Sequence, residues 1–540
     1  MKSVVVRLAV AAAIFLAVAA FWSSTRSFDF VNFDDGEYVT ENDHVLGGLS
    51  AANVKWAWTT AGYAANWHPL TWMSLQMDVS LTGGDERLPG AMHLHNAILH
   101  ALNAALLFLL AVMFLGKCDD EGERCPVADW WIFGMSALMA IAWAVHPLRA
   151  EAVAWVSERK EVLSSFFMLL TLIVYLKSAK SIALLGLSLV FYALALAAKP
   201  VAVSLPMVVL ALDWLRGGRP RWWRFAAFSL LAAACTGLTL LAQQGAMPGT
   251  YIPFKWRVPN AFASIFTYFE QTFIPRNLAA YYPFRLSVDW LRMSGGLLLV
   301  AGGVWWACRS AVGRLALAWI GVGLLPMLGI LQVGGQSHAD RYTYWVGCGV
   351  ALAVLAMLAK WREVCAGDGM YAMFRRRSLE WASIVVLAVL AAVYGVLGGW
   401  QRDTWRNTEA MFAQAYRATH SGWAANGLGD SCAMYDPVRA ESLYREALAE
   451  SRNDESLAKL ACFLSAQPKI RDSAEIYALC DEAERLDAAN WQIYEARGIT
   501  LMREGRFAEA VPVLEKALAR GSGNPMIAKM REDALRLSQK

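Results

Sequence analysis

The chain has 540 residues, of which 57% are hydrophobic and 17% charged, and its formal net charge is +4. Soluble domains contain about 25% charged residues, so this composition indicates a membrane protein and excludes an ordinary soluble enzyme. The small net charge, without a basic stripe that is interleaved with aromatic residues, argues against nucleic-acid binding.

Eleven hydrophobic runs have the length and composition of candidate membrane spans. They lie at residues 4–22, 93–115, 128–147, 162–178, 181–198, 200–215, 225–243, 294–308, 314–331, 342–359 and 380–400. The sequence therefore predicts an all-α, polytopic membrane protein with about 11 transmembrane helices. A cleaved signal peptide is the alternative for the first run, because Lys2 and Arg7 precede an apolar stretch that ends in small residues.

Positively charged residues in short loops predict the orientation of the chain. They gather in alternate loops, at Lys177, Lys180, Arg216, Arg219, Arg221, Arg224, Arg309, Arg314, Lys360, Arg362, Arg375, Arg376 and Arg377. If these loops are cytoplasmic, the N-terminus is cytoplasmic and the C-terminal region lies outside. Three external stretches follow, at 24–92, 146–161 and 244–293. The third contains no clear span, and its aromatic residues suggest a segment in the plane of the membrane interface.

Residues 401–540 are more charged than the rest and contain a repeat. The spacing Ala440-x3-Tyr444-x2-Ala447 recurs at Ile476-x3-Cys480-x2-Ala483 and at Ala510-x3-Leu514-x2-Ala517. This spacing is typical of tetratricopeptide repeats, whose stacked helices usually bind a peptide or protein. The sequence thus predicts a transmembrane domain at 1–400 and a repeat domain at 401–540 on the non-cytoplasmic side. A packing cap on the membrane domain is the alternative role of the repeats.

An acidic pair, Asp34-Asp35, follows the first hydrophobic run closely. Carboxylates near a bilayer cost free energy unless they bind or react with something, so the pair is a candidate catalytic site. A helix cap or a solvated loop end is the alternative explanation.

The second external loop carries His146, Glu151, Glu158, Arg159 and Lys160. A helix over 150–162 would bring Glu151, Trp155 and Glu158 near one face. Arg159 and Lys160 could then neutralise a phosphate, although a cluster of interfacial side chains is the alternative.

Two further groups are predicted on the same side of the membrane. His68 lies in Asn66-Trp67-His68-Pro69-Leu70-Thr71-Trp72, and Asp340-Arg341-Tyr342 follows the ninth run. Arg341 suits bidentate phosphate binding, with a structural ion pair as the alternative. Carboxylates, imidazoles and cations beside an apolar bundle suit a substrate with a charged head and a lipid tail. A transporter is disfavoured, because the spans contain almost no internal charge.

These motifs resemble a known family of enzymes. Its motifs are matched by Asn32-Phe33-Asp34-Asp35, by residues 66–72, by His146-Pro147-Leu148-x2-Glu151-x3-Trp155 with Arg159-Lys160, and by Ala339-Asp340-Arg341-Tyr342. The family is that of the protein O-mannosyltransferases with transmembrane and tetratricopeptide-repeat domains and their bacterial relatives, within the GT-C superfamily. The resemblance covers about 1–345 and extends through the repeats.

The resemblance implies an inverting transfer of a monosaccharide, mannose or a similar hexose, from a polyprenyl-phosphate donor to Ser or Thr hydroxyls of exported proteins. It implies that Asp34 is the catalytic base, with Asp35 and Glu151 as further catalytic residues; Asp35 stands where the family has Glu. Contacts to substrate and phosphate are expected from His68, His146, Arg159, Lys160, Asp340, Arg341 and Tyr342. A divalent metal, Mg²⁺ or Mn²⁺, would be held by Asp34, Asp35 and Glu151, and the sequence leaves the need for a metal open.

Two other functions remain open at this point. A GT-C transferase acting on a lipid or cell-envelope glycan would use the same chemistry with another acceptor. A non-enzymatic membrane scaffold presenting its repeats would need neither Asp34-Asp35 nor Glu151. Short loops, and the lack of an organellar signal other than the first run, favour a bacterial inner membrane with periplasmic repeats.

Overall fold

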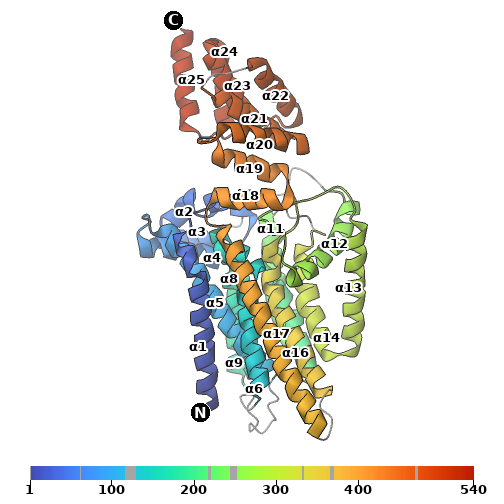
Figure 1. Ribbon diagram of the computed structural model, residues 1–540. Coiled ribbons are helices and arrows are strands. Elements are labelled where there is room, and N and C mark those ends of the chain that lie inside the picture. The colour runs from blue at the N-terminus through green and yellow to red at the C-terminus, as the bar shows by residue number, and fades with distance from the viewer. Residues whose placement is uncertain are drawn as a thin grey trace. The chain divides into compact units, whose positions relative to one another are not determined.

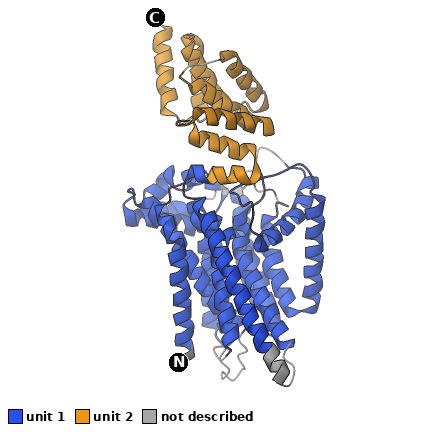
Figure 2. Ribbon diagram, viewed as in Figure 1, with its two compact units in different colours: residues 1–410 blue, residues 411–540 orange. Residues whose placement is uncertain are grey.

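A computed structural model of the chain describes residues 2–60, 62–115, 129–216, 220–243, 252–330, 332, 334–364, 370–468 and 472–539. The chain divides into two compact units, Met1–Ala410 and Met411–Lys540 (Figure 2). The division falls close to the boundary that the change in composition predicts at residue 400.

Unit 1 is built from apolar helices that range from 3 to 34 residues in length. These are α1 (Lys2–Trp22), α5 (Leu88–Leu115), α6 (Trp130–Ala144), α8 (Arg159–Lys177), α9 (Ile182–Ala198), α10 (Leu205–Leu215), α11 (Trp222–Gln243), α13 (Trp290–Arg309), α14 (Ala311–Ala316), α15 (Val322–Leu324), α16 (Thr343–Val364) and α17 (Met370–Asp403). Local sequence fixes several starts: the side chains of Asp129 and Ser181, for example, accept hydrogen bonds from the first turns of α6 and α9.

The structure supports fewer spans than the sequence predicts. Among the described residues, seven helices are long and apolar enough to cross a membrane, and an eighth span is possible if the pair 130–144 and 147–154, bent by 59°, counts as one. The predicted runs at 181–198, 200–215 and 314–331 form shorter apolar helices, at Ile182–Ala198, Pro200–Leu215 and Ala311–Met327. An integral membrane protein is confirmed, and the number eleven stays a prediction.

The predicted external stretches fold into short elements at one end of unit 1 (Figure 1). The first contains η1 (Ser23–Ser27), η2 (Gly36–Thr40), α2 (Asp43–Leu46), α3 (Ala51–Thr59), η3 (Tyr63–Ala65) and α4 (Pro69–Thr82). The second contains η5 (Pro147–Arg149), α7 (Ala150–Ala154) and η6 (Val156–Glu158), and the third α12 (Phe254–Phe273) and β1 (Tyr282–Pro283). At the same end are η8 (Pro200–Ser204), β2 (Gln336–His338), antiparallel to β1, and η11 (Asp340–Tyr342). The remaining short helices of unit 1 are η7 (Ser178–Lys180), η9 (Leu317–Gly321) and η10 (Leu325–Met327).

The first external stretch has a hydrophobic core of its own. Tyr38, Val39 and Trp72 lie in this core with Met92 of α5, and all are at most 2% exposed. Val156 of the second external stretch is buried in the same cluster. Because burial of large apolar side chains is the main stabilising contribution to folding, this shared core fixes the two loops against each other.

Helix α17 packs closely against the bend between α6 and η5. A Cβ atom on Gly398 would lie 2.0 Å from the carbonyl oxygen of Val145, whereas one on the neighbouring Gly399 would meet nothing within 4 Å. Small residues at such crossings let two backbones approach each other in a membrane.

We expect Gly398→Val to lower the thermal unfolding midpoint of the purified protein and Gly399→Val to leave it unchanged. The new side chain at 398 must displace backbone, which costs about 1–3 kcal/mol or more. Equal midpoints for the two variants would contradict the close approach of α17 to Val145.

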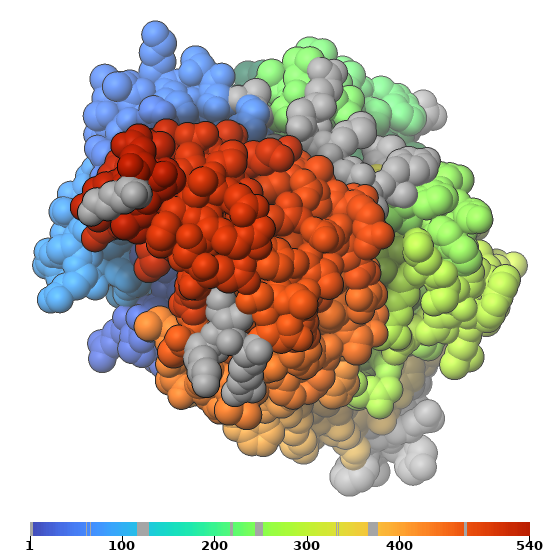
Figure 3. Space-filling view, turned by 90° about the horizontal axis from the view of Figure 1, so that it is seen from above, coloured from blue at the N-terminus to red at the C-terminus, as the bar shows by residue number. Residues whose placement is uncertain are grey.

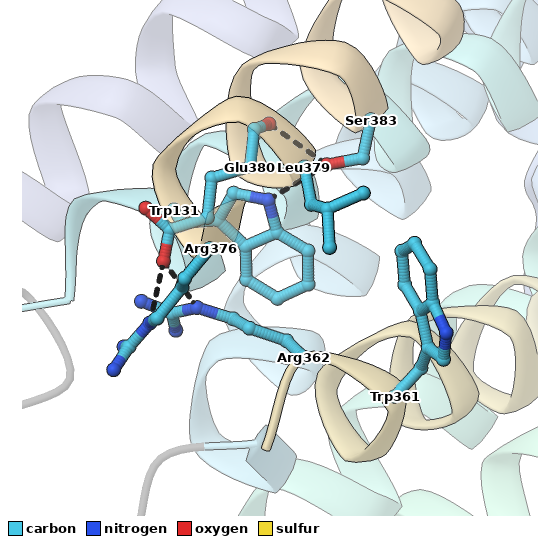
Figure 4. Close-up of a pocket in the computed structure, with 7 residues that line it drawn as sticks. All are labelled: Trp131, Trp361, Arg362, Arg376, Leu379, Glu380 and Ser383. Carbon is cyan, nitrogen blue, oxygen red and sulfur yellow. Dashed lines mark hydrogen bonds and ion pairs between the residues drawn. The ribbon is translucent and has the colours of Figure 1, made fainter. Parts of the chain in front are cut away.

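The opposite end of unit 1 carries a small pocket lined by both aromatic and charged residues (Figure 4). Arg362 of α16 forms ion pairs of 2.5 Å with both Asp129 and Glu380, and Arg376 lies 3.0 Å from Glu380. The Arg362 guanidinium also stacks on Trp131. These ion pairs join α6, α16 and α17 at this end of unit 1.

Unit 2 is a series of helices, as the sequence predicts. They are α18 (Thr408–Thr419), which begins at the end of unit 1, α19 (Gly422–Cys432), α20 (Pro437–Glu450), α21 (Asp454–Ala466), α22 (Ser473–Leu486), α23 (Trp491–Arg503), α24 (Phe507–Ala519) and α25 (Pro525–Ser538). Their side chains pack in one continuous mass, orange to red in Figure 3.

The repeated small residues explain how the helices of unit 2 pack. Ala440, Ala447, Ala510 and Ala517 are all fully buried. A Cβ atom on Gly498 of α23 would lie 2.4 Å from Cδ2 of a leucine of α24. Small side chains at these positions let consecutive helices approach, which is the packing that the repeat predicts.

Candidate active site

Asp35 joins the first external loop to the second. Its Oδ1 accepts hydrogen bonds from the backbone N–H of Ser157, at 3.1 Å, and from the Ser157 hydroxyl, at 2.5 Å. Its Oδ2 accepts from the backbone N–H of Val31 at 3.0 Å. The side chain is 1% exposed. Burial raises the pKa of the Asp35 carboxyl to about 6, against the lowering effect of these hydrogen bonds.

This raised pKa predicts a pH dependence of stability. A carboxyl whose pKa is higher in the folded state stabilises the fold fully below its unfolded value, 3.8, and this contribution is lost as the pH rises through about 6. We expect the wild type to lose about 3 kcal/mol of stability over this range relative to Asp35→Asn. Unfolding midpoints of both proteins between pH 4 and 7 measure the difference. If the midpoints of the two proteins changed with pH in the same way, the raised pKa of Asp35 would be contradicted.

Asp34 has different surroundings from its neighbour. Its side chain is half-buried, and none of the described residues donates a hydrogen bond to its carboxylate. The ring of Phe33 stacks on Trp155 of the second loop, with the centroids 4.9 Å apart and the planes 11° apart. The charges of Asp34 and Lys160 interact electrostatically. Asp34 thus has a carboxylate that remains available to another molecule beside a cation.

A network of buried charges lies next to this aromatic stack. Glu151 accepts a hydrogen bond from the backbone N–H of Arg341 at 2.6 Å and also binds its guanidinium. Glu158 lies 3.2 Å from Lys160, 3.0 Å from Lys199 and 3.5 Å from Arg341. One carboxylate is therefore shared by three cations from three separate segments.

The cations of this network are more exposed than its carboxylates. The side chains of Lys160, Lys199 and Arg341 are 11–13% exposed, and those of Glu151 and Glu158 only 1–2%. The ammonium of Lys160 also lies 4.2 Å from the ring centroid of a tyrosine. An anion that entered from solvent would meet the cations before the carboxylates.

The single helix over 150–162 that would align Glu151, Trp155 and Glu158 does not form. Helix α7 ends at Ala154, Trp155 is extended with φ −91° and ψ 123°, and α8 begins at Arg159. Glu151 and Glu158 meet through Arg341 rather than along a helix face. The Arg341 guanidinium also lies over the ring of Trp155, 5.6 Å from its centroid.

Arg159 is turned into the protein instead of toward the network. It donates 2.8 Å hydrogen bonds to Asp78 and Ser74 and also binds Asn96. Burial raises the pKa of Asp78, but Arg159 and His95 outweigh it and hold the pKa below its usual value. Arg159 and Lys160 are consecutive residues of α8, so their side chains point about 100° apart, and Arg159 lies on the side of Asp78. Contact of Arg159 with a phosphate stays a prediction.

The two His-Pro-Leu triplets have different surroundings. Nδ1 of His146 accepts from the backbone N–H of Leu148, and Nε2 donates to the carbonyl oxygen of Thr272 at 3.0 Å. Both ring nitrogens are thus occupied by backbone groups, which leaves none for a ligand.

His68, in contrast, lies beside the charge network. It is 1% exposed, its ring stacks on Tyr38, and its Nε2 has no hydrogen-bond partner among the described residues. Burial, with Lys160 and Lys199 nearby, holds the pKa of His68 well below its usual value. A neutral imidazole with one unsatisfied nitrogen is a candidate substrate contact.

Of the Asp340-Arg341-Tyr342 triplet, only Arg341 reaches the network. Asp340 is buried and accepts a 2.8 Å hydrogen bond from the hydroxyl of Tyr282. The Tyr342 hydroxyl accepts from the side chain of Gln336. These two residues hold the chain on either side of Arg341.

Lys199 is a member of the network that sequence reasoning missed. It stands alone between α9 and η8, and besides Glu158 it pairs with Glu161 at 2.6 Å. The available signal was a single Lys between two apolar runs, followed by Pro200, on the predicted external side.

The predicted metal ligands do not assemble. In the part of the chain that the structure describes, no group of three His, Cys, Asp or Glu side chains could hold a metal ion. The carboxylate oxygens of Asp35 are occupied by Ser157 and Val31, and Glu151 is bound by Arg341. The trio Asp34, Asp35 and Glu151 therefore does not fit a divalent cation.

Comparisons with known proteins match part of this chain. Over 199 residues, 34% of the chain, it is 28% identical to the protein O-mannosyl-transferase Tmtc2 of Drosophila melanogaster, of which the match covers 19%. It is 30% identical to TMTC4 of Mus musculus over 29% of the chain, and 29% identical to human TMTC2 over the same share.

This chain is similar to the TMTC protein O-mannosyl-transferases over about a third of its length. The matches cover about a fifth of these relatives, 17–21% of their length. No protein-family model matches the sequence. Yeast Tom70 superposes with a TM-score of 0.23 at 12% identity, covering 75% of this chain and 92% of Tom70. The APC/C hetero-tetramer Cut9–Hcn1 superposes with a TM-score of 0.24 at 13% identity, covering 90% of this chain and 97% of that chain.

Proposed function

We propose that this protein is an inverting glycosyltransferase that moves mannose or a similar hexose from a polyprenyl-phosphate donor to Ser or Thr hydroxyls of exported proteins. The observation that carries the proposal is the convergence of Asp34 with Lys160, Lys199 and Arg341 at one end of the apolar helices. A lipid-linked donor needs an apolar bundle for its tail and cations for its phosphate, and the acceptor hydroxyl needs a base.

Asp34 accepts the proton of the acceptor hydroxyl while that oxygen attacks the anomeric carbon. General-base catalysis of this kind contributes about 10²–10⁴-fold. The bond from the anomeric carbon to the phosphate oxygen breaks on the opposite face, so configuration inverts and the polyprenyl phosphate leaves. Lys160, Lys199 and Arg341 stabilise the negative charge that grows on the phosphate. Glu151, bound to Arg341, holds the guanidinium in place.

The same proposal extends to the surroundings of the enzyme. We place it in a bacterial inner membrane with the N-terminus in the cytoplasm and the repeats in the periplasm. Unit 2 is a stack of helices of the kind that commonly binds peptides or proteins, which suits the holding of a protein acceptor.

Transfer of radiolabelled mannose from a polyprenyl-phosphate donor to protein tests the proposal. Membranes that contain the wild type should label protein at Ser and Thr. Label found in lipid or in an envelope glycan would favour a GT-C transferase with another acceptor. No label with several donors would contradict the enzyme and favour a scaffold that presents its repeats.

A further inference from the structure

The segment that follows the last apolar helix contacts the loop that carries Asp34. The backbone N–H of Asp29 donates to the carbonyl oxygen of Arg406 at 3.0 Å. The backbone N–H of Asn32 donates to the hydroxyl oxygen of Thr408 at 2.9 Å. These residues are almost 400 positions apart in sequence, and both bonds lie within unit 1.

The same segment closes the aromatic stack at the candidate site. Trp405 is 2% exposed, and its ring stacks on Trp155 with the centroids 5.5 Å apart and the planes 23° apart. Trp155 in turn stacks on Phe33, the residue before Asp34. Trp155 also underlies the Arg341 guanidinium. Trp405 therefore packs against the Trp155 ring, which contacts both the residue before Asp34 and the Arg341 guanidinium.

We propose that residues 404–408 are positioning residues for the catalytic loop. This segment, called the strap, runs from the end of α17 to the first residue of α18. Asp34 is held from both sides. Thr408 binds the backbone at Asn32, two residues before it, and Ser157 binds Asp35, the residue after it. The strap fixes the first of these anchors, and Trp405 fixes the ring against which Phe33 lies. The inference rests on the proposed function, since it assigns a role to the strap in that reaction.

The physical reason for a kinetic effect is the sensitivity of proton transfer to position. A displacement of about 1 Å in a reacting group can cost about 10²-fold in rate. Loss of the Trp405 ring would leave a void behind Trp155, and loss of the Thr408 hydroxyl would leave the Asn32 N–H without its acceptor. Neither change removes a group that touches the substrate.

The test compares Trp405→Ala and Thr408→Val with the wild type in the transfer assay. We expect kcat to fall by about 10–100-fold in Trp405→Ala and by about 3–10-fold in Thr408→Val, with KM for the donor changed by less than about threefold. Trp405→Phe and Thr408→Ser should recover most of kcat, because they keep a ring and a hydroxyl at these positions.

Trp319→Ala is the matched control. Trp319 is 1% exposed and stacks on Trp345 with the centroids 4.6 Å apart, in the part of unit 1 that contains α16. Its removal creates a comparable void and should lower the unfolding midpoint by a similar amount while kcat stays near the wild-type value. Equal losses of kcat in Trp319→Ala and Trp405→Ala would overturn the proposal, since a general loss of stability would then explain both.

Hydrogen–deuterium exchange gives a readout that does not depend on activity. Amides in 28–38 should exchange faster in Trp405→Ala and Thr408→Val, and those in 43–59, which form α2 and α3, should not. The proposed function stands if the wild type transfers sugar and Asp34→Asn does not. In that case, both strap variants showing wild-type hydrogen exchange and wild-type kcat would overturn this inference alone. If the wild type transfers no sugar, the proposed function fails, and exchange still decides whether the strap holds the loop.

Discussion

Replacing Asp34 by Asn is expected to lower kcat for sugar transfer by about 10²–10⁴-fold, the usual contribution of a general base. The unfolding midpoint should stay unchanged. The Asp34 carboxylate is half-buried, and among the described residues no group donates a hydrogen bond to it. Its neutral isostere therefore leaves no buried group unsatisfied. Steady-state transfer to a Ser- or Thr-containing peptide measures kcat, and thermal unfolding measures stability.

Asp35→Asn is the matched comparison for this experiment. Asp35 uses both of its carboxylate oxygens to bind Ser157 and Val31, so its replacement should alter stability and its pH dependence more than proton transfer. The opposite pattern, with full activity in Asp34→Asn and none in Asp35→Asn, would assign the base to Asp35. Full activity in both variants would remove the acidic pair from the mechanism.

Replacing Arg341 by Met is expected to cost about 3–5 kcal/mol of stability and most of the transfer activity. Arg341 is the cation bound to Glu151, and it also lies 3.5 Å from Glu158. Removal of one partner from a buried ion pair leaves an uncompensated charge, which accounts for the size of the penalty. Thermal unfolding of the purified protein measures the loss.

A double variant separates the two effects of this change. In Arg341→Met with Glu151→Gln the carboxylate no longer needs a counterion, so most of the stability should return. Transfer should stay low, because one of the three cations that stabilise the leaving phosphate is still missing. Recovery of both properties would show that Arg341 serves only the fold. Unchanged stability in the single variant would contradict the buried ion pair.

The apolar helices were predictable from the sequence because hydrophobic run length is a local property. Each predicted run corresponds to an apolar helix or to the bent pair. Run length alone does not reveal whether a helix crosses the bilayer, and three of the runs form helices of 17 residues or fewer. The repeats of unit 2 were visible because their small residues recur at a fixed period and pack against neighbouring helices.

The candidate site was predictable only in part, because its residues come from distant segments. Arg159 and Lys160 are adjacent and both cationic, yet one binds Asp78 and the other Glu158. Both lie in the first turn of α8, where consecutive side chains point about 100° apart, so their partners depend on what packs on each side of the helix.

Partners far along the chain also explain why the two histidines have different surroundings and why Lys199 was not predicted. His68 and His146 share the same local triplet, but Thr272, far along the chain, occupies a nitrogen of His146 alone. Lys199 enters the network only because η8 brings it to Glu158 and Glu161. Such long-range pairs depend on packing rather than on local pattern.

In the proposed reaction a lipid-linked sugar is transferred to protein with Asp34 as the general base. The most direct test reconstitutes purified wild type and Asp34→Asn in liposomes with radiolabelled polyprenyl-phosphate mannose and a Ser- or Thr-rich protein acceptor. We expect label on protein with the wild type and a loss of at least about 100-fold with Asp34→Asn. Equal labelling by the two proteins, or none by the wild type, would contradict the proposed reaction.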